Sequence, residues 1–137
     1  MDKLSRQNPA ISLLEQAPFS LLLGLRVESA ENGEAVARMP FEIKLLNHGG
    51  PGMPIHGGAI AALADFAACA AVWTLPETQR SATIAMTVNY SGPGIQSDLV
   101  ACARVRRKSR RVASLTVEIH DEAGALIADA LVTYKIA

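Results

Sequence analysis

The sequence predicts an α+β protein in which a curled antiparallel sheet wraps around one long helix. The central observation is an apolar run from His56 to Trp73 that carries a single charged side chain, Asp65. A helix that is apolar on every side should be buried. Strand-like segments stand on both sides of this run, two before it and four after it. A flat sheet would cover only one side of the helix, so the sheet must curl, and a second subunit must cover what remains.

The segments before the long helix form a short helical lead-in and a hairpin. Residues 9–16 can form a helix, and Pro18 either ends it or starts a second turn over residues 19–23. The pair Asn32-Gly33 is a strong signal for a tight turn between two strands. The expected strands are residues 24–30 and 34–41, followed by a loop over residues 45–54.

The long helix and the strands after it follow from residue type. Alanine dominates residues 59–71 without internal Gly or Pro, which favours a helix, and Pro76 prevents its continuation. The later segments are rich in β-branched residues and are separated by turn residues. The four expected strands are residues 83–90, 99–107, 112–120 and 126–135, arranged as a meander.

Composition limits the class of protein. The 137 residues predict one domain, residues 1–137, with a helical lead-in over residues 1–18. Half of the residues are hydrophobic and the formal net charge is zero, so neither disorder nor a global attraction to nucleic acid or membrane is expected. Residues 1–7 are polar, unlike a signal peptide, and no apolar run approaches the roughly 20 residues that cross a bilayer. A cytoplasmic protein is expected.

The segment around His56-Gly57-Gly58 has the marks of a catalytic site. The two glycines stand where the helix begins, so their backbone N–H groups can point at a ligand. Burying a carboxylate such as Asp65 costs free energy unless polar groups bond to it. Its presence in this helix therefore suggests a function. A buried acid and a free helix N-terminus in one segment suggest catalysis.

The order of elements, with His56-Gly57-Gly58 opening the long helix and Asp65 seven residues after Gly58, resembles the hotdog-fold thioesterases. The most similar group is the acyl-CoA thioesterases of the phenylacetate-degradation (PaaI-like) type. The resemblance covers about residues 19–136. It implies that the Gly57 N–H binds the thioester oxygen and that Asp65 drives hydrolysis. It also implies that Asn47 helps to place the water and that Thr83 is the hydroxyl residue of the following strand.

The spacing of Gly57 and Asp65 predicts a dimer. Eight residues of helix span about 12 Å, which no aspartate side chain bridges. The two groups can meet only if helices from two subunits pack antiparallel, so each site would join Gly57 of one chain to Asp65 of the other. Asp65 would be a general base or a nucleophile, and the sequence does not separate the two. Pairing of dimers into a tetramer also stays open.

Several residues are expected to contact the substrate. Gly58 lies beside the oxyanion donor, and apolar residues of the helix and the next strand should line the acyl pocket: Ile60, Leu63, Phe66 and Met86. Arg104, Arg106, Lys108 and Arg110 alternate along one face of a strand and its turn, with Arg107 and Arg111 on the other. This cluster is either a solvated hairpin tip or a clamp for the phosphates of coenzyme A, with Arg107, Lys108, Arg110 and Arg111 as candidates. Nucleic acid is not expected, because no aromatic residues interleave with the arginines.

The histidines and cysteines fit structural roles better than chemical ones. His56 can bond the substrate carbonyl or brace the start of the helix, and bracing is favoured. His48 and His120 lack metal-ligand spacing to it, so no metal is expected. Cys69 has no histidine spaced to activate it and is expected in the core.

Two other functions stay open. A hotdog domain can bind acyl-CoA without hydrolysing it, although no output segment supports a sensor. A hydratase or dehydratase would need a His/Asp or His/Glu pair, which an acid in mid-helix fits less well. No cofactor is expected except coenzyme A as part of the substrate.

Overall fold

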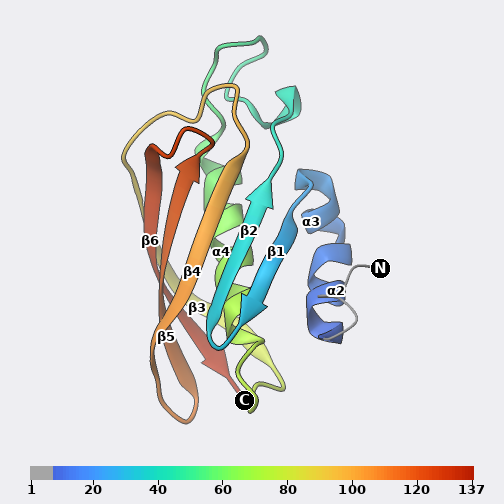
Figure 1. The fold of residues 1–137 in the computed structure, drawn as a ribbon, viewed down its shortest axis with the longest axis vertical. Helices are drawn as coiled ribbons and strands as arrows, with labels where there is room; N and C mark the ends of the chain where they lie inside the picture. Colours follow the sequence, from blue (N-terminus) through green and yellow to red (C-terminus); the bar gives the residue numbers. More distant parts are fainter. Residues whose placement is uncertain (1–7) are drawn as a thin grey trace.

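The computed structural model describes residues 8–137, and the start of the predicted lead-in, residues 1–7, lies outside them. A six-stranded antiparallel sheet curls around the helix α4 (Gly57–Val72), and two short helices flank one edge of the sheet (Figure 1). The flanking helices are α2 (Pro9–Gln16) and α3 (Pro18–Leu23), so Pro18 both follows one helix and opens the next. The α+β architecture with a curled sheet is therefore confirmed.

The first two strands form the predicted hairpin. The strand β1 (Arg26–Glu31) pairs with β2 (Glu34–Met39), and Asn32 and Gly33 at the turn have φ of 52° and 78°. Two successive left-handed residues make the turn whose twist matches a hairpin. The strand begins later than expected because Gly24, with φ 70°, caps the C-terminus of α3.

The remaining strands do not form the simple meander that the sequence predicts. They are β3 (Ser81–Tyr90), β4 (Leu99–Lys108), β5 (Val112–Asp121) and β6 (Leu126–Ile136). The sheet order is β1-β2-β4-β5-β6-β3, so only β4, β5 and β6 follow one another as a meander. The strand β3 pairs with β6 at the edge, and β4 takes the place beside β2. Local turn signals could not predict this strand order, because the order depends on pairing between segments that are distant in the sequence.

The core lies between α4 and the inner face of the sheet. Leu63, Ala67 and Ala71 on the helix are fully buried, as are Leu99 and Ile119 on the sheet. The many alanines let the helix backbone approach the strands closely. None of the helices within residues 8–137 has the length and apolar character needed to cross a membrane.

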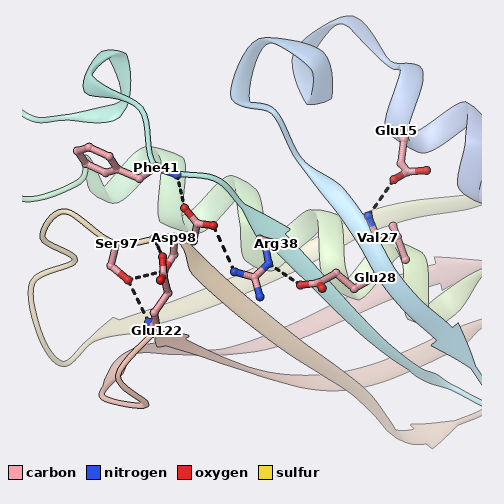
Figure 2. A network of polar contacts seen from close by, with 8 residues as sticks. All are labelled: Glu15, Val27, Glu28, Arg38, Phe41, Ser97, Asp98 and Glu122. Carbon is pink, nitrogen blue, oxygen red and sulfur yellow. Dashed lines mark hydrogen bonds and ion pairs between the residues drawn. The ribbon is translucent and has the colours of Figure 1, made fainter.

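A polar network fastens the edge hairpin to the rest of the sheet (Figure 2). Arg38 on β2 contacts Glu28 on β1 at 2.7 Å and Asp98, just before β4, at 3.2 Å. The second oxygen of Asp98 accepts the backbone N–H of Phe41 at 2.7 Å. This places the start of β4 against the end of β2, from which the chain leads toward α4.

Helix α2 covers the outer edge of β1. Glu15 accepts the backbone N–H of Val27 at 3.0 Å, as Figure 2 shows. An edge N–H that is bonded in this way is not available to pair with another strand. The opposite edge of the sheet, formed by β3, has no such cover within residues 8–137.

Candidate active site

Asp65 lies in the middle of α4 and faces the junction of β3 and β6. It is half-buried, and its Oδ1 accepts two hydroxyl hydrogen bonds: from Thr83 Oγ1 at 2.7 Å and from the Tyr134 hydroxyl at 2.6 Å. Tyr134 is 3% exposed and its hydroxyl also lies 3.0 Å from the backbone oxygen of Asp65. These hydroxyls are the partners that allow a carboxylate to lie in an apolar helix.

Sequence reasoning missed Tyr134, which contacts Asp65 at the candidate site. It is separated from Asp65 by 69 positions, so no local spacing connects them. A weak signal was present, because the inward positions of the last strand alternate through Val132, Tyr134 and Ile136. A tyrosine at a buried strand position needs a partner for its hydroxyl.

The start of α4 is built by His56, which is the N-cap residue. Its Nδ1 accepts the backbone N–H of Gly58 at 2.8 Å, so His56 braces the helix. A Cβ at position 58 would lie 2.9 Å from that nitrogen, which explains why glycine stands there. The N–H of Gly58 is thus engaged, whereas no group within residues 8–137 accepts the N–H of Gly57.

Tyr90, at the end of β3, packs against Gly57. Its hydroxyl donates to the Gly57 carbonyl oxygen at 2.9 Å, and a Cβ at position 57 would lie 3.3 Å from the ring. The strand β3 therefore touches α4 at two places, through Tyr90 at the helix start and through Thr83 at Asp65. This strand helps to position both Asp65 and Gly57, whose N–H has no acceptor among the described residues.

The loop before α4 brings Asn47 back toward the helix. Leu46 and Ile55 form an isolated bridge, and the N–H of Asn47 donates to Pro54 at 3.0 Å. The eight residues between Asn47 and His56 are therefore folded into a closed loop. The side chain of Asn47 is exposed and makes no hydrogen bond to His56, Gly57 or Asp65 among residues 8–137, so its expected role at the site stays a prediction.

The helix α4 leaves one face incompletely covered. Gly58 is exposed, and the other residues of α4 are buried except for five that are half-buried: Gly57, Ala61, Ala62, Asp65 and Cys69. These positions recur at three- and four-residue intervals and therefore form one stripe. The expected burial of the helix on every side is thus wrong for a single chain, because the sheet wraps α4 only in part.

The residues expected in the acyl pocket lie in or against the core. Leu63 is fully buried, and Ile60 and Phe66 are 3% and 5% exposed, so in the part of the chain that the structure describes these three side chains are enclosed in the core. Met86 is half-buried on β3 and packs against the core. A separate groove of about 210 Å³ lies at the start of α4, and it is lined by Phe19, Leu23, Lys44, Leu45, Leu46, His56, Gly58 and Ala59.

The basic cluster lies at the tip of the β4–β5 hairpin, near the C-terminus (Figure 1). A bulge between Val105 and Arg107 breaks the alternation that the sequence suggested. Arg107 then pairs with exposed Ser114, and Lys108 with buried Ala113, so Lys108 does not share a face with Arg104. The predicted division of the cluster between two faces is therefore wrong.

The members of the cluster differ in their partners. Lys108 contacts Glu77 at 2.6 Å, and this hydrogen bond holds the pKa of Glu77 below its usual range. Arg107, Arg110 and Arg111 are exposed. The structure thus leaves three arginines at the tip facing solvent and gives the lysine a carboxylate partner.

Cys69 is unsuited to nucleophilic chemistry. Burial raises the pKa of its thiol, and its Sγ lies 3.9 Å from Ser81 Oγ rather than beside a histidine. A raised pKa keeps the sulfur protonated near neutral pH, and a thiol is a weak nucleophile. In this part of the molecule Asp65, and not Cys69, is therefore the candidate for a reactive group.

Comparisons with known proteins agree with this geometry. Residues 55–128, which include α4 and Asp65, match the model of the thioesterase superfamily. The chain belongs to this superfamily. Its fold is the hotdog fold, and among solved structures the PaaI protein of the Escherichia coli phenylacetic acid degradation operon superimposes with a TM-score of 0.81. The two share 25% identity, and the alignment covers 98% of this chain and 96% of PaaI.

Two curated proteins are similar to this chain in sequence. The medium/long-chain acyl-CoA thioesterase YigI of Salmonella typhimurium is 32% identical over 134 residues, covering 87% of this chain and 85% of YigI. A protein of Halobacterium salinarum named "Putative esterase VNG_1336C" is 37% identical over 100 residues. That alignment covers 71% of this chain and 66% of the archaeal protein, slightly less than two thirds of its length.

Proposed function

We propose that the protein hydrolyses acyl-CoA thioesters to a free acid and coenzyme A. The observation that supports this most strongly is Asp65, a carboxylate held by two hydroxyls on the one helix face that the sheet leaves open. Membership of the thioesterase superfamily and the similarity to YigI support the same reaction. Asp65 either removes a proton from the attacking water or attacks the thioester carbonyl itself.

The oxyanion donor in this proposal is the Gly57 N–H. It is the first N–H of α4, it has no acceptor within residues 8–137, and it stands at the positive end of the helix. A donor held in place before the reaction stabilises the negative charge that develops on the thioester oxygen. His56 contributes by bracing the turn that presents this N–H.

The complete site requires two copies of the chain. Gly57 and Asp65 lie about 12 Å apart along one helix axis, so they serve one carbonyl only across an interface. The small side chains of Gly58, Ala61 and Ala62 allow a second α4 to approach closely. The edge of β3 is uncovered, and Ile84 and Tyr90 on it are 58% and 54% exposed. A second copy packed against α4 and β3 would bury these residues and form two composite sites.

The first experiment measures release of free thiol from acyl-CoA esters of different length and aromaticity. Turnover by the wild type and loss of turnover in Asp65→Asn are expected. Tight binding of the esters without thiol release would instead support a non-catalytic acyl-CoA-binding protein. Hydration of an enoyl-CoA without hydrolysis would support a hydratase.

A matched pair of substitutions tests the oxyanion donor. Gly57→Pro removes the N–H at the first helical position, where proline is tolerated. Gly57→Ala adds a comparable contact with Tyr90 but keeps the N–H. We expect kcat to fall about 10²–10³-fold more in the proline variant than in the alanine variant. Equal activity of the two variants would exclude the Gly57 N–H as the donor.

Mixed dimers test the composite site. A subunit with Asp65→Asn and a subunit with Gly57→Pro form one intact site when they pair, because each supplies what the other lacks. Random pairing should restore about a quarter of the wild-type activity. If donor and acid belonged to the same subunit, mixing would restore nothing.

The exposed arginines of the basic cluster, Arg107, Arg110 and Arg111, are proposed to contact the phosphates of coenzyme A. Arg110→Ala and Arg111→Ala should raise KM for an acyl-CoA and leave KM for the matching acyl-pantetheine unchanged, because the truncated substrate lacks the nucleotide phosphates. An equal rise in KM for both substrates would show that these arginines do not bind the nucleotide phosphates.

A further inference from the structure

Asp65 has two carboxylate oxygens with different surroundings. Both hydroxyl donors, Thr83 Oγ1 and the Tyr134 hydroxyl, lie on Oδ1 at 2.7 and 2.6 Å. Within residues 8–137 no donor lies on Oδ2. Two donors occupy both lone-pair directions of one oxygen, so the other oxygen keeps its lone pairs for chemistry.

We propose that Tyr134 is a positioning residue, which holds Oδ1 of Asp65 so that Oδ2 is the oxygen that reacts. This inference rests on the proposed hydrolysis of thioesters and assigns a role to a residue outside the motif at the start of α4. Tyr134 touches Asp65 and not the substrate, so it acts through the orientation of the carboxylate.

The sheet supplies the geometry. Tyr134 on β6 pairs directly with Thr83 on β3 and with Ala113 on β5. Cross-strand partners present their side chains on the same face, so the two hydroxyls reach α4 side by side. Tyr134 is 3% exposed and packed within the core, which leaves its ring little freedom. A rigid pair of donors therefore meets the carboxylate.

The Tyr134 hydroxyl is suited to remain a donor. Its single proton can go to Asp65 Oδ1 at 2.6 Å or to the Asp65 backbone oxygen at 3.0 Å, and the charged oxygen is the nearer and stronger acceptor. Burial raises the pKa of Tyr134, and the neighbouring Cys69 and Asp65 raise it further. The hydroxyl thus stays protonated throughout the pH range in which the protein would work.

The role is the same for both possible mechanisms. If Asp65 is a general base, Oδ2 takes the proton of the attacking water while Oδ1 keeps its two hydrogen bonds. If Asp65 is a nucleophile, Oδ2 forms the bond to the acyl carbon as the C–S bond breaks and the CoA thiolate leaves, and water then hydrolyses the acyl-aspartyl anhydride to the free acid and the Asp65 carboxylate. In either case, a carboxylate that rotates about its Cβ–Cγ bond would lose the orientation of Oδ2.

The test compares Tyr134→Phe in two backgrounds. In the wild type we expect kcat to fall about tenfold with KM changed less than twofold, because binding is retained and orientation is lost. In the Asp65→Asn background the same substitution should change the residual rate less than twofold, because the group that Tyr134 positions is gone. An equal loss in both backgrounds, or a rise in KM at constant kcat, would overturn the proposal.

A second measurement does not depend on turnover or on the folding of Tyr134→Phe. The Tyr134 hydroxyl proton should give a downfield proton resonance in the wild type that moves upfield in Asp65→Asn. An unchanged resonance would show that the hydroxyl donates elsewhere and would also overturn the proposal. A wild type without thioesterase activity but with this shift would refute the proposed function alone.

Discussion

Two half-buried aspartates, Asp98 and Asp65, are held in opposite ways. Asp98 uses both oxygens: Oδ2 contacts the Arg38 guanidinium at 3.2 Å, and Oδ1 accepts the Phe41 N–H at 2.7 Å (Figure 2). Asp65 receives only neutral hydroxyls, and both lie on Oδ1. The first arrangement satisfies a charge and joins two strands. The second leaves one oxygen free at an open helix face, which is what a reactive carboxylate needs.

The largest effect is expected from Asp65→Asn. The amide keeps the shape and can still accept the hydroxyls, but it can neither take a proton nor attack a carbonyl. Turnover should fall about 10²–10⁴-fold. Thiol release measures this, and thermal unfolding at a fixed protein concentration should show an unchanged or slightly higher Tm. Retained turnover in Asp65→Asn would show that Asp65, like Asp98, has no part in the chemistry.

Asp98→Ala should show the reverse behaviour. It leaves Arg38 and the Phe41 N–H without this partner, and we expect the free energy of unfolding to fall by about 1–3 kcal/mol. The value of kcat/KM at a temperature where the variant is folded should stay within twofold. Denaturant unfolding and thiol release, each beside Asp65→Asn, measure the contrast. A large loss of kcat with normal stability would mean that Asp98 belongs to the site.

A smaller effect is expected at Thr83, the exposed donor to Asp65. Thr83→Val keeps the shape of the side chain and removes the hydroxyl, so kcat should fall about two- to tenfold. Thr83→Ser keeps the donor and is the matched control, with a change of less than twofold. Steady-state kinetics of the two variants distinguish loss of the hydrogen bond from loss of packing, since equal effects would indicate packing.

The smallest effect is expected at Cys69, which lies one turn after Asp65 on the open face of α4. Burial raises the pKa of its thiol, so little thiolate is present at neutral pH. Cys69→Ala should leave kcat within twofold. A loss comparable to that of Asp65→Asn would make the thiol, and not the carboxylate, the reactive group.

Much of the fold and of the candidate site followed from local patterns. The alanine-rich helix, the Asn32-Gly33 hairpin and the strand segments could be predicted because periodicity and turn chemistry act over a few residues. The combination of Gly57, Asp65 and Thr83 was also predicted, and the structure brings Thr83 to Asp65 at 2.7 Å. The role of each of these residues stays a prediction.

Other features depended on contacts between distant segments. The place of β3 beside β6, the bulge that turns Lys108 toward Glu77, and the closing of the loop that returns Asn47 toward α4 have no local signature. Each results from strand pairing or from a bond between residues far apart in the chain. Sequence patterns describe which face a side chain occupies and do not say which strand will lie opposite.

The sequence by itself determined that an acid lies in the middle of an apolar helix, about 12 Å from the free N–H at its start. That distance follows from helix geometry alone and already argues for two subunits. Only the tertiary structure decided how the acid is held, because Tyr134 reaches it from 69 positions away through the pairing of β6 with β3. Spacing along one helix is fixed by the backbone, whereas the partner of a buried carboxylate is fixed by the order of the strands.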